Sequence, residues 1–184
     1  MLEITFIGRG GQGAVLASQI LAKVYFLMGL YPQCYSLFGG ERRGAPVASF
    51  LRVDQNKILL KCEIKRPDRM IFLASDLIDE KEIQANLKPD GLLLINNSSA
   101  QPLPGFKKFR LALIDARSIA EAMGLGATIN TAILGAYLRA DGTIPFAHLE
   151  QAIRETVPAK IEANIKAAER AYEQTQLMER ESND

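Results

Sequence analysis

A glycine-rich turn near the amino terminus constrains the fold most, because it joins an apolar run to a helical pattern. Leu2–Ile7 is short and rich in β-formers, whereas Ala14–Leu30 carries apolar residues at helical spacing. Between them, Gly8–Gly13 satisfies the pattern Gly-x-Gly-x-x-Gly. Glycines at these positions permit a tight turn and close backbone approach, and the first amides of a helix favour an anion such as phosphate. The pattern therefore predicts a strand, a glycine loop and a helix in succession.

Apolar runs and helical patterns alternate along the rest of the chain. We expect strands at Tyr35–Phe38, Val47–Val53, Lys57–Cys62, Arg69–Ala74, Leu92–Asn96 and Arg110–Ile114. We expect helices from Asp76 to about Leu87 and at Ser118–Met123, Thr128–Arg139, Pro145–Thr156 and Ala159–Leu177. The turn signal at 54–56 predicts that Val47–Val53 and Lys57–Cys62 form a hairpin.

This order of elements predicts an α/β fold. We expect residues 1–184 to form a single three-layer α/β/α domain with a Rossmann-like start, in which residues 178–184 are a frayed tail. The hairpin adds antiparallel pairing, so we expect a mixed, mostly parallel sheet.

Composition excludes several classes of partner. The chain has 184 residues, 23% of them charged, and a net charge of +1, so nothing favours binding to nucleic acid or to an anionic membrane. Apolar runs such as Ala132–Leu138 are too short to span a membrane, and residues 1–7 do not resemble an export signal. Cys34 and Cys62 lie far apart, which argues against a disulfide framework. We therefore expect a cytoplasmic protein.

The same counts limit the chemistry that the chain performs alone. Two separated cysteines do not ligate an ordinary iron–sulfur cluster, and one histidine, His148, does not make a histidine-rich metal site. We expect no metal site, and no residue is assigned a catalytic role.

The glycine loop lacks one companion of a nicotinamide-dinucleotide site. Such sites usually carry an acid at the end of the second strand to hold the ribose hydroxyls, and Cys34–Gly39 contains none. The loop therefore favours phosphate binding, or close packing of helix on sheet, over NAD binding. The sequence leaves these two alternatives level.

A second glycine-rich segment, residues 38–47, carries the sequence Phe-Gly-Gly-Glu-Arg-Arg-Gly-Ala-Pro-Val. Its adjacent Arg42 and Arg43 offer forked donors suited to phosphate or carboxylate. The alternative is a solvated loop in which Glu41 pairs with an arginine, an arrangement worth little energy.

Taken together, Gly8–Val15 and Phe38–Val47 resemble the gamma subunit of pyruvate and related 2-oxoacid:ferredoxin oxidoreductases. Asn130–Ala136 is similar to a late helix of that family, and Ile161–Tyr172 to its closing helix. The resemblance covers nearly the whole chain, and two motifs at this separation make it specific.

The resemblance implies a role within a larger enzyme. In this family a 2-oxoacid is decarboxylated on thiamine diphosphate, electrons pass through iron–sulfur clusters to ferredoxin or flavodoxin, and the acyl group passes to coenzyme A. It implies that partner subunits of the alpha, beta and delta types hold thiamine diphosphate and the clusters. This chain would complete the assembly, help to hold coenzyme A and be inactive alone.

The resemblance also implies roles for individual residues. The candidate cofactor-binding residues are Gly8, Gly10, Gly11, Gln12, Gly13, Arg42 and Arg43. Gln12 either caps the helix or bonds a ligand, and the two arginines meet either phosphate or a neighbouring subunit. We expect Asn130 to hydrogen-bond a buried backbone group, and Ser98 and Ser99 to cap a turn.

Several alternatives compete with this interpretation. A stand-alone nucleotide-binding or regulatory module explains the glycine loop but not Arg42 and Arg43. An NAD-dependent dehydrogenase lacks the ribose-binding acid and a catalytic domain, and a hydrolase lacks Gly-x-Ser-x-Gly. The oxoacid stays open among pyruvate, 2-oxoglutarate, branched-chain and aryl forms, although the form Glu-Arg-Arg-Gly-Ala-Pro leans toward the pyruvate branch.

Overall fold

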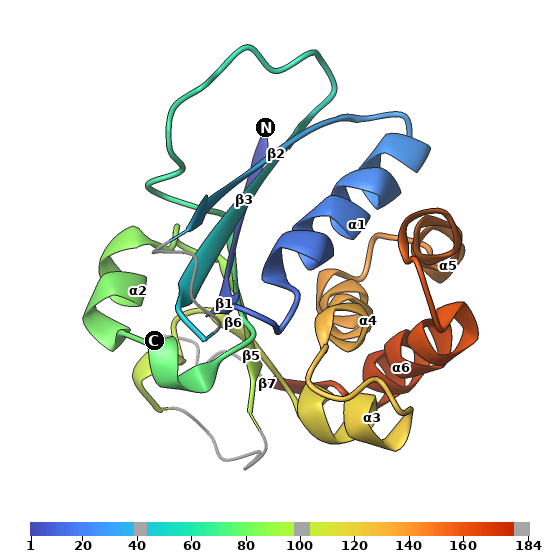
Figure 1. The fold of residues 1–184 in the computed structure, drawn as a ribbon. Helices are drawn as coiled ribbons and strands as arrows, with labels where there is room; N and C mark the ends of the chain where they lie inside the picture. Colours follow the sequence, from blue (N-terminus) through green and yellow to red (C-terminus); the bar gives the residue numbers. More distant parts are fainter. Residues whose placement is uncertain (39–43, 98–103, 179–184) are drawn as a thin grey trace.

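The computed structural model describes residues 1–38, 44–97 and 104–178, which form a seven-stranded sheet with helices on both faces (Figure 1). The strands are β1 (Leu2–Arg9), β2 (Tyr31–Phe38), β3 (Pro46–Asp54), β4 (Arg69–Phe72), β5 (Leu92–Asn96), β6 (Arg110–Ile114) and β7 (Gln176–Met178). The helices are α1 (Ala14–Leu27), α2 (Glu80–Asn86), α3 (Ala116–Ala122), α4 (Asn130–Asp141), α5 (Phe146–Thr156) and α6 (Ile161–Gln174). Two short 3-10 turns, η1 (Ser75–Leu77) and η2 (Pro104–Phe106), complete the described elements.

The sheet is mixed, as the sequence predicts. Its order is β2-β3-β1-β4-β5-β6-β7, with parallel pairing from β1 through β6 and antiparallel pairing at both margins. Three of the parallel strands, β4, β5 and β6, are almost continuously apolar, as expected for strands with helices on both faces. Their carboxyl ends meet at one edge, which also receives the glycine loop.

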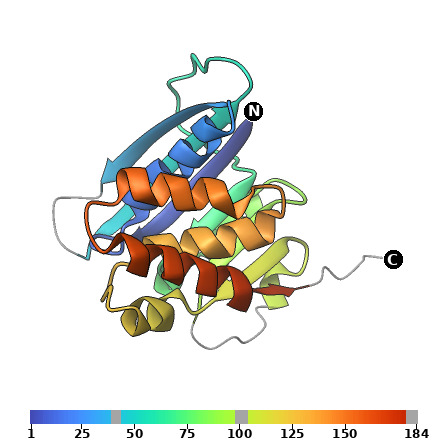
Figure 2. The same ribbon diagram turned by 90° about the vertical axis from the view of Figure 1, so that its right-hand side faces the viewer.

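The helices cover the two faces unequally. In Figures 1 and 2, α1 and α3 through α6 lie on one face, and α2 lies on the other. Helices α5 and α6 are strongly amphipathic and pack on α1 and α4. Helix α4 is buried on almost every side, because it lies between the sheet and α6.

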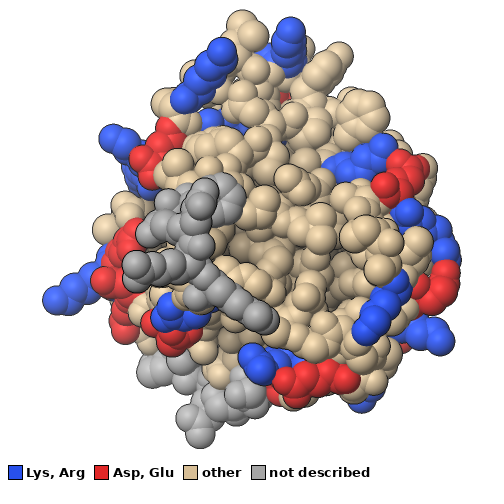
Figure 3. Space-filling model, in the orientation of Figure 1, with Lys and Arg blue, Asp and Glu red and all other residues tan. Residues whose placement is uncertain are grey.

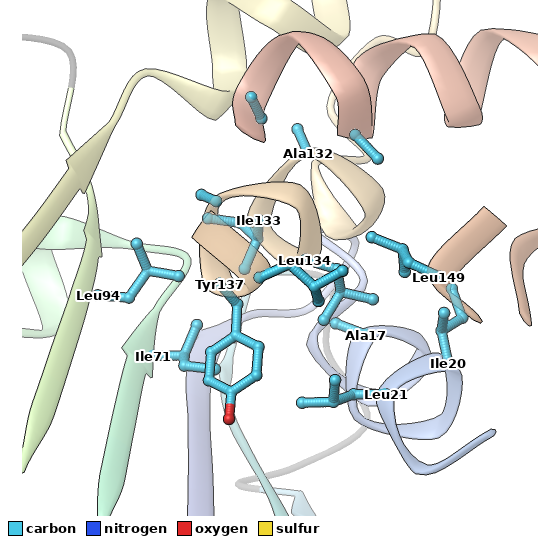
Figure 4. Close-up of a cluster of buried hydrophobic side chains, with 14 of the residues drawn as sticks. Ala17, Ile20, Leu21, Ile71, Leu94, Ala132, Ile133, Leu134, Tyr137 and Leu149 are labelled. Atoms are coloured by element: carbon cyan, nitrogen blue, oxygen red, sulfur yellow. The ribbon is translucent and has the colours of Figure 1, made fainter. Parts of the chain in front are cut away.

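The main core surrounds α4 (Figure 4). Ile133, Leu134 and Tyr137 of α4 meet α1 and the sheet residues Ile71 and Leu94. The hydroxyl of the buried Tyr137 lies 2.9 Å from that of Tyr25 on α1, so this pair satisfies its polar atoms inside the core. The core therefore fixes where α1 and α4 begin relative to each other.

The predicted hairpin is wrong in its second strand. Strand β3 pairs with β2 on one side and β1 on the other, so residues 57–62 find no free edge beside it. They belong instead to an irregular segment that connects β3 to β4. Arg52 and Tyr35 anchor this connecting segment to the sheet, because each donates a hydrogen bond to the carbonyl oxygen of Cys62, at 2.7 and 3.2 Å.

Two other predicted elements differ from the observed ones. The helix predicted from Asp76 is split, because Asp79 takes an extended conformation and caps α2 by accepting from the amides of Lys81 and Glu82. The last helix ends at Gln174, and β7 then pairs with the open edge of β6. Met178 is therefore part of the sheet rather than of a frayed tail, and residues 179–184 lie outside the described residues.

The other predicted helices and strands are present, with ends that differ by a few residues. Within the described part of the chain, no helix combines the length and the apolar character needed to cross a lipid bilayer.

Candidate functional site

The glycine loop connects β1 to α1 through two residues in the left-handed region. Gly11 has φ +98°, and Gly13, the residue before α1, has φ +88°. A side chain is strained in this region, so both positions favour glycine. A Cβ on Gly13 would also lie 3.0 Å from the Cβ of Asn130, and one on Gly8 would lie 3.1 Å from the Cβ of Leu73. The loop therefore permits close packing, one of the two roles that the sequence left level.

Gln12 stabilises the glycine loop through hydrogen bonds to the loop's own backbone. Its backbone amide donates to the carbonyl of Arg9, and its side-chain oxygen accepts from the Arg9 amide at 2.7 Å. Its side-chain nitrogen lies 3.4 Å from the carbonyl of Leu73. These internal bonds give Gln12 a role in shaping the loop.

The start of β3 lies directly against the glycine loop. The Gly10 amide donates to the carbonyl of Ala45 at 2.9 Å, and the Gly44 amide donates to the carbonyl of Gly10 at 3.2 Å. Arg42 and Arg43 lie outside the described residues, as do Ser98 and Ser99. Gly44, which directly follows these two arginines in the sequence, nevertheless lies beside the glycine loop.

An ion pair between Arg9 and Asp76, which the sequence alone does not predict, links the glycine loop to the segment after β4. The guanidinium of Arg9 binds the carboxylate of Asp76, with Nε 2.9 Å from Oδ2, and donates through Nη1 to the carbonyl of Gly44. The hydrogen bond from Arg9 lowers the pKa of Asp76. Only the sheet order could have revealed this pair, because β4 and β1 are parallel neighbours that bring residues 9 and 76 together.

Two helix amino termini meet at the loop. The amide of Ile129, just before α4, lies 3.3 Å from the carbonyl of Gln12, just before α1. Among residues 1–38, 44–97 and 104–178, the amides of Gly11 and Gly13 donate to no protein acceptor. These amides and the first turns of α1 and α4 direct unpaired N–H groups toward one region.

A hollow of about 360 Å³ lies at this junction. Its described lining consists of Arg9, Gly10, Gly11, Gly13, Ala14, Val15, Leu16, Gln19, Val47, Thr128 and Asn130. Arg9 is the charged residue among them, and Asp76 balances its charge. In the orientation of Figure 1, the middle of the molecular surface is uncharged and hollowed, with charged side chains around its margin (Figure 3).

Asn130 lies at the first position of α4 and is 1% exposed. Its side-chain oxygen accepts from the amide of the buried Thr131 at 2.8 Å, the kind of contact that the sequence predicts. Its side-chain nitrogen faces Gly13, where a Cβ would lie 3.2 Å away.

The two cysteines lie apart from the glycine loop in different environments. Cys34 is half-buried with its sulfur 3.1 Å from the Ser18 hydroxyl, and Cys62 is exposed. No group of three or more His, Cys, Asp or Glu residues suited to a metal ion occurs within the described ranges.

Comparison with known families gives one match that spans most of the chain. The family model described as pyruvate ferredoxin/flavodoxin oxidoreductase matches residues 3–174. A Pyrococcus furiosus protein named pyruvate/ketoisovalerate oxidoreductases common subunit gamma is 44% identical over 97% of this chain and 100% of the relative. The pyruvate synthase subunit PorC of Methanocaldococcus jannaschii is 42% identical over 94% of this chain and 96% of the relative.

Solved structures agree with these sequence relatives. Pyruvate oxidoreductase subunit PORC of Thermotoga maritima superimposes with a TM-score of 0.82 at 30% identity, covering 97% of this chain and 98% of that one. A 2-oxoglutarate:ferredoxin oxidoreductase of Magnetococcus marinus shares the fold, with a TM-score of 0.77 at 18% identity. The match covers 94% of this chain but 30% of that one, so there the fold is one part of a much longer polypeptide.

Proposed function

We propose that this chain, which belongs to the pyruvate ferredoxin/flavodoxin oxidoreductase family as a gamma-type subunit, helps to bind coenzyme A in the assembled enzyme. The observation that carries the proposal is the pair of unbonded amides at Gly11 and Gly13, beside a hollow at the start of α1. Such amides, together with the helix dipole, receive phosphate. Coenzyme A supplies phosphates and accepts the acyl group left by oxidative decarboxylation.

The rest of the reaction belongs to partner subunits in this proposal. Thiamine diphosphate and the iron–sulfur clusters lie on alpha-, beta- and delta-type subunits, and ferredoxin or flavodoxin accepts the electrons. Relatives named as subunits, which this chain matches over nearly their whole length, support this division of labour. We expect each contact with a large partner to bury roughly 800 Å² on this chain.

The structure weakens the case for NAD at the same site, but for a reason different from the predicted one. The parallel neighbour of β1 is β4 rather than β2, and Asp76 follows β4, so an acid does lie near the loop. Arg9 pairs with one oxygen of its carboxylate, so binding of the ribose hydroxyls would compete with this ion pair.

The proposal is tested in the assembled enzyme with Gly11→Ala. A methyl group strains the backbone at φ +98° and displaces the amide that faces the hollow. The Michaelis constant for coenzyme A should rise by about tenfold or more, which corresponds to one lost charge-assisted bond. The Michaelis constant for the oxoacid should stay unchanged.

Gly29→Ala is the matched control, because Gly29 also has a positive φ, of +82°, but lies in open space at the end of α1. Arg42→Ala and Arg43→Ala test the other candidate residues and should also raise the Michaelis constant for coenzyme A. If the arginine variants weaken assembly and leave the dependence on coenzyme A unchanged, the arginines bind a neighbouring subunit instead.

A further inference from the structure

The start of α4 contains a polar side chain whose hydrogen bonds are only partly satisfied. Asn130 is 1% exposed, and its oxygen accepts from the Thr131 amide. Its Nδ2 group donates to no acceptor within the described residues. The nitrogen is not among the fully enclosed polar atoms that lack a partner, so it reaches the hollow that Asn130 lines. There it is available to donate to a ligand.

The unsatisfied nitrogen lies in the hollow at the glycine loop. Asn130 belongs to the lining of that hollow, together with Gly11 and Gly13. A Cβ on Gly13 would be 3.2 Å from Nδ2, so the nitrogen sits beside the residue that begins α1. A ligand atom that accepts from the loop amides is therefore also within reach of Nδ2.

The two helices that meet here both present uncapped amino termini. Neither α1 nor α4 has a side-chain cap, and neither carries an acidic residue in its first turn. In contrast, Asp79 caps α2 and Asp115 caps α3. Apart from the Thr131 amide, which bonds the Asn130 oxygen, the first-turn amides of α1 and α4 add favourable potential for an anion. No carboxylate in those turns opposes it.

The lining also indicates what kind of anion fits. The charge of Arg9 is balanced by Asp76, and Val15, Leu16 and Val47 supply apolar surface beside the donors. Neutral donors next to apolar side chains suit a phosphate group attached to an organic body better than a free inorganic ion.

We infer that Asn130 is a side-chain ligand for a phosphate of coenzyme A, held between the amino termini of α1 and α4. This inference rests on the proposed function. It adds a second helix and one specific side chain to a site that the sequence assigns to the glycine and arginine loops.

Asn130→Asp in the assembled enzyme tests the inference. The substitution keeps the shape of the side chain, but it replaces the donor with a carboxylate that repels phosphate. A carboxylate at the first turn of a helix is favourable to the helix, so α4 should persist. We expect the Michaelis constant for coenzyme A to rise at least tenfold, with an unchanged Michaelis constant for the oxoacid and intact assembly by size exclusion.

Two further variants make the result decisive. Asn130→Ala removes the donor without adding charge and should raise the Michaelis constant for coenzyme A by a smaller factor, about threefold to tenfold. Asn56→Asp adds the same charge at an exposed turn after β3 and should change nothing. Pantetheine, which lacks the phosphates, serves as a probe in competition against coenzyme A, and its inhibition constant should be the same in wild type and in Asn130→Asp.

The outcomes separate this inference from the proposed function. Unchanged coenzyme A constants in both Asn130 variants, alongside a raised constant in Gly11→Ala, would overturn the inference and leave the proposed function standing. Unchanged constants in all three would overturn both. Loss of assembly in both Asn130 variants, or an equal loss of pantetheine binding, would assign Asn130 to packing and not to phosphate.

Discussion

Thr5 of β1 is a buried polar residue on the sheet face opposite α1. The residue is 6% exposed, and its hydroxyl has no hydrogen-bond partner among the described residues. A buried hydroxyl without a partner costs about 1–3 kcal/mol, whereas valine fills the same space and suits a strand. We predict that Thr5→Val raises the free energy of unfolding by about 1 kcal/mol in urea titration. If Thr5→Val instead lowers the free energy of unfolding by a similar amount, the hydroxyl has a hydrogen-bond partner, for example water.

The Arg9–Asp76 pair gives a second prediction at this scale. Because Arg9 lowers the pKa of Asp76, the contribution of the pair is present at neutral pH and is lost as the pH falls through that depressed value, below the ordinary value of about 3.9. Asp76→Asn should release Arg9 and speed hydrogen exchange of the Gly10 amide, which bonds Ala45. Glu121→Gln, which disturbs an exposed pair on α3, is the control. Unchanged exchange at Gly10 in Asp76→Asn would show that the pair does not hold the loop.

The sequence predicts single residues well where the backbone dictates the residue type. The pattern of glycines identifies Gly11 and Gly13, whose left-handed conformations need them. It does not identify Arg9 and Asp76, because they are 67 positions apart and meet only through strand order. The assignment of Arg42 and Arg43 to coenzyme A stays a prediction.

At the scale of elements, Gly135 sets the distance between α4 and α6. A Cβ at this position would lie 1.9 Å from the carbonyl oxygen of Ala168, which is backbone and does not rotate away. Alanine normally stabilises a helix interior relative to glycine by about 1 kcal/mol, so a loss of stability would identify the close approach. We predict that Gly135→Ala lowers the free energy of unfolding by about 2–3 kcal/mol, measured in urea.

Gly29→Ala is again the control, since its added methyl group meets nothing within 4 Å and bears only the conformational penalty of about 1 kcal/mol. If Gly135→Ala costs no more than Gly29→Ala, the two helices have room to move apart and the packing argument fails.

The sequence predicts most of the helices and strands, but not the three-residue strand β7 or the absence of a strand at residues 57–62. The helical pattern continues beyond Gln174, and three residues are too few to show the alternation of a strand, so β7 could not be predicted. Residues 57–62 have the composition of a strand but no free edge to pair with. Both corrections depend on which strand edges the rest of the fold leaves open.

At the scale of the whole molecule, the sheet is organised around β1, which separates an antiparallel pair from a parallel set. The alternation of elements predicts the mixed α/β architecture, but not the insertion of β3 between β1 and β2. This order brings the starts of α1 and α4 to the same edge as Gly44. The candidate site is thus made by sequence segments that are far apart in the chain.

Reconstitution of the enzyme tests the central claim most directly. The larger subunits should be purified without this chain, and oxoacid-dependent reduction of ferredoxin measured before and after it is added. We predict that the chain alone is inactive and contains neither iron nor thiamine diphosphate, and that its addition restores reduction that depends on coenzyme A. Robust activity of the chain alone, or full coenzyme A-dependent activity of the larger subunits without it, would contradict the account.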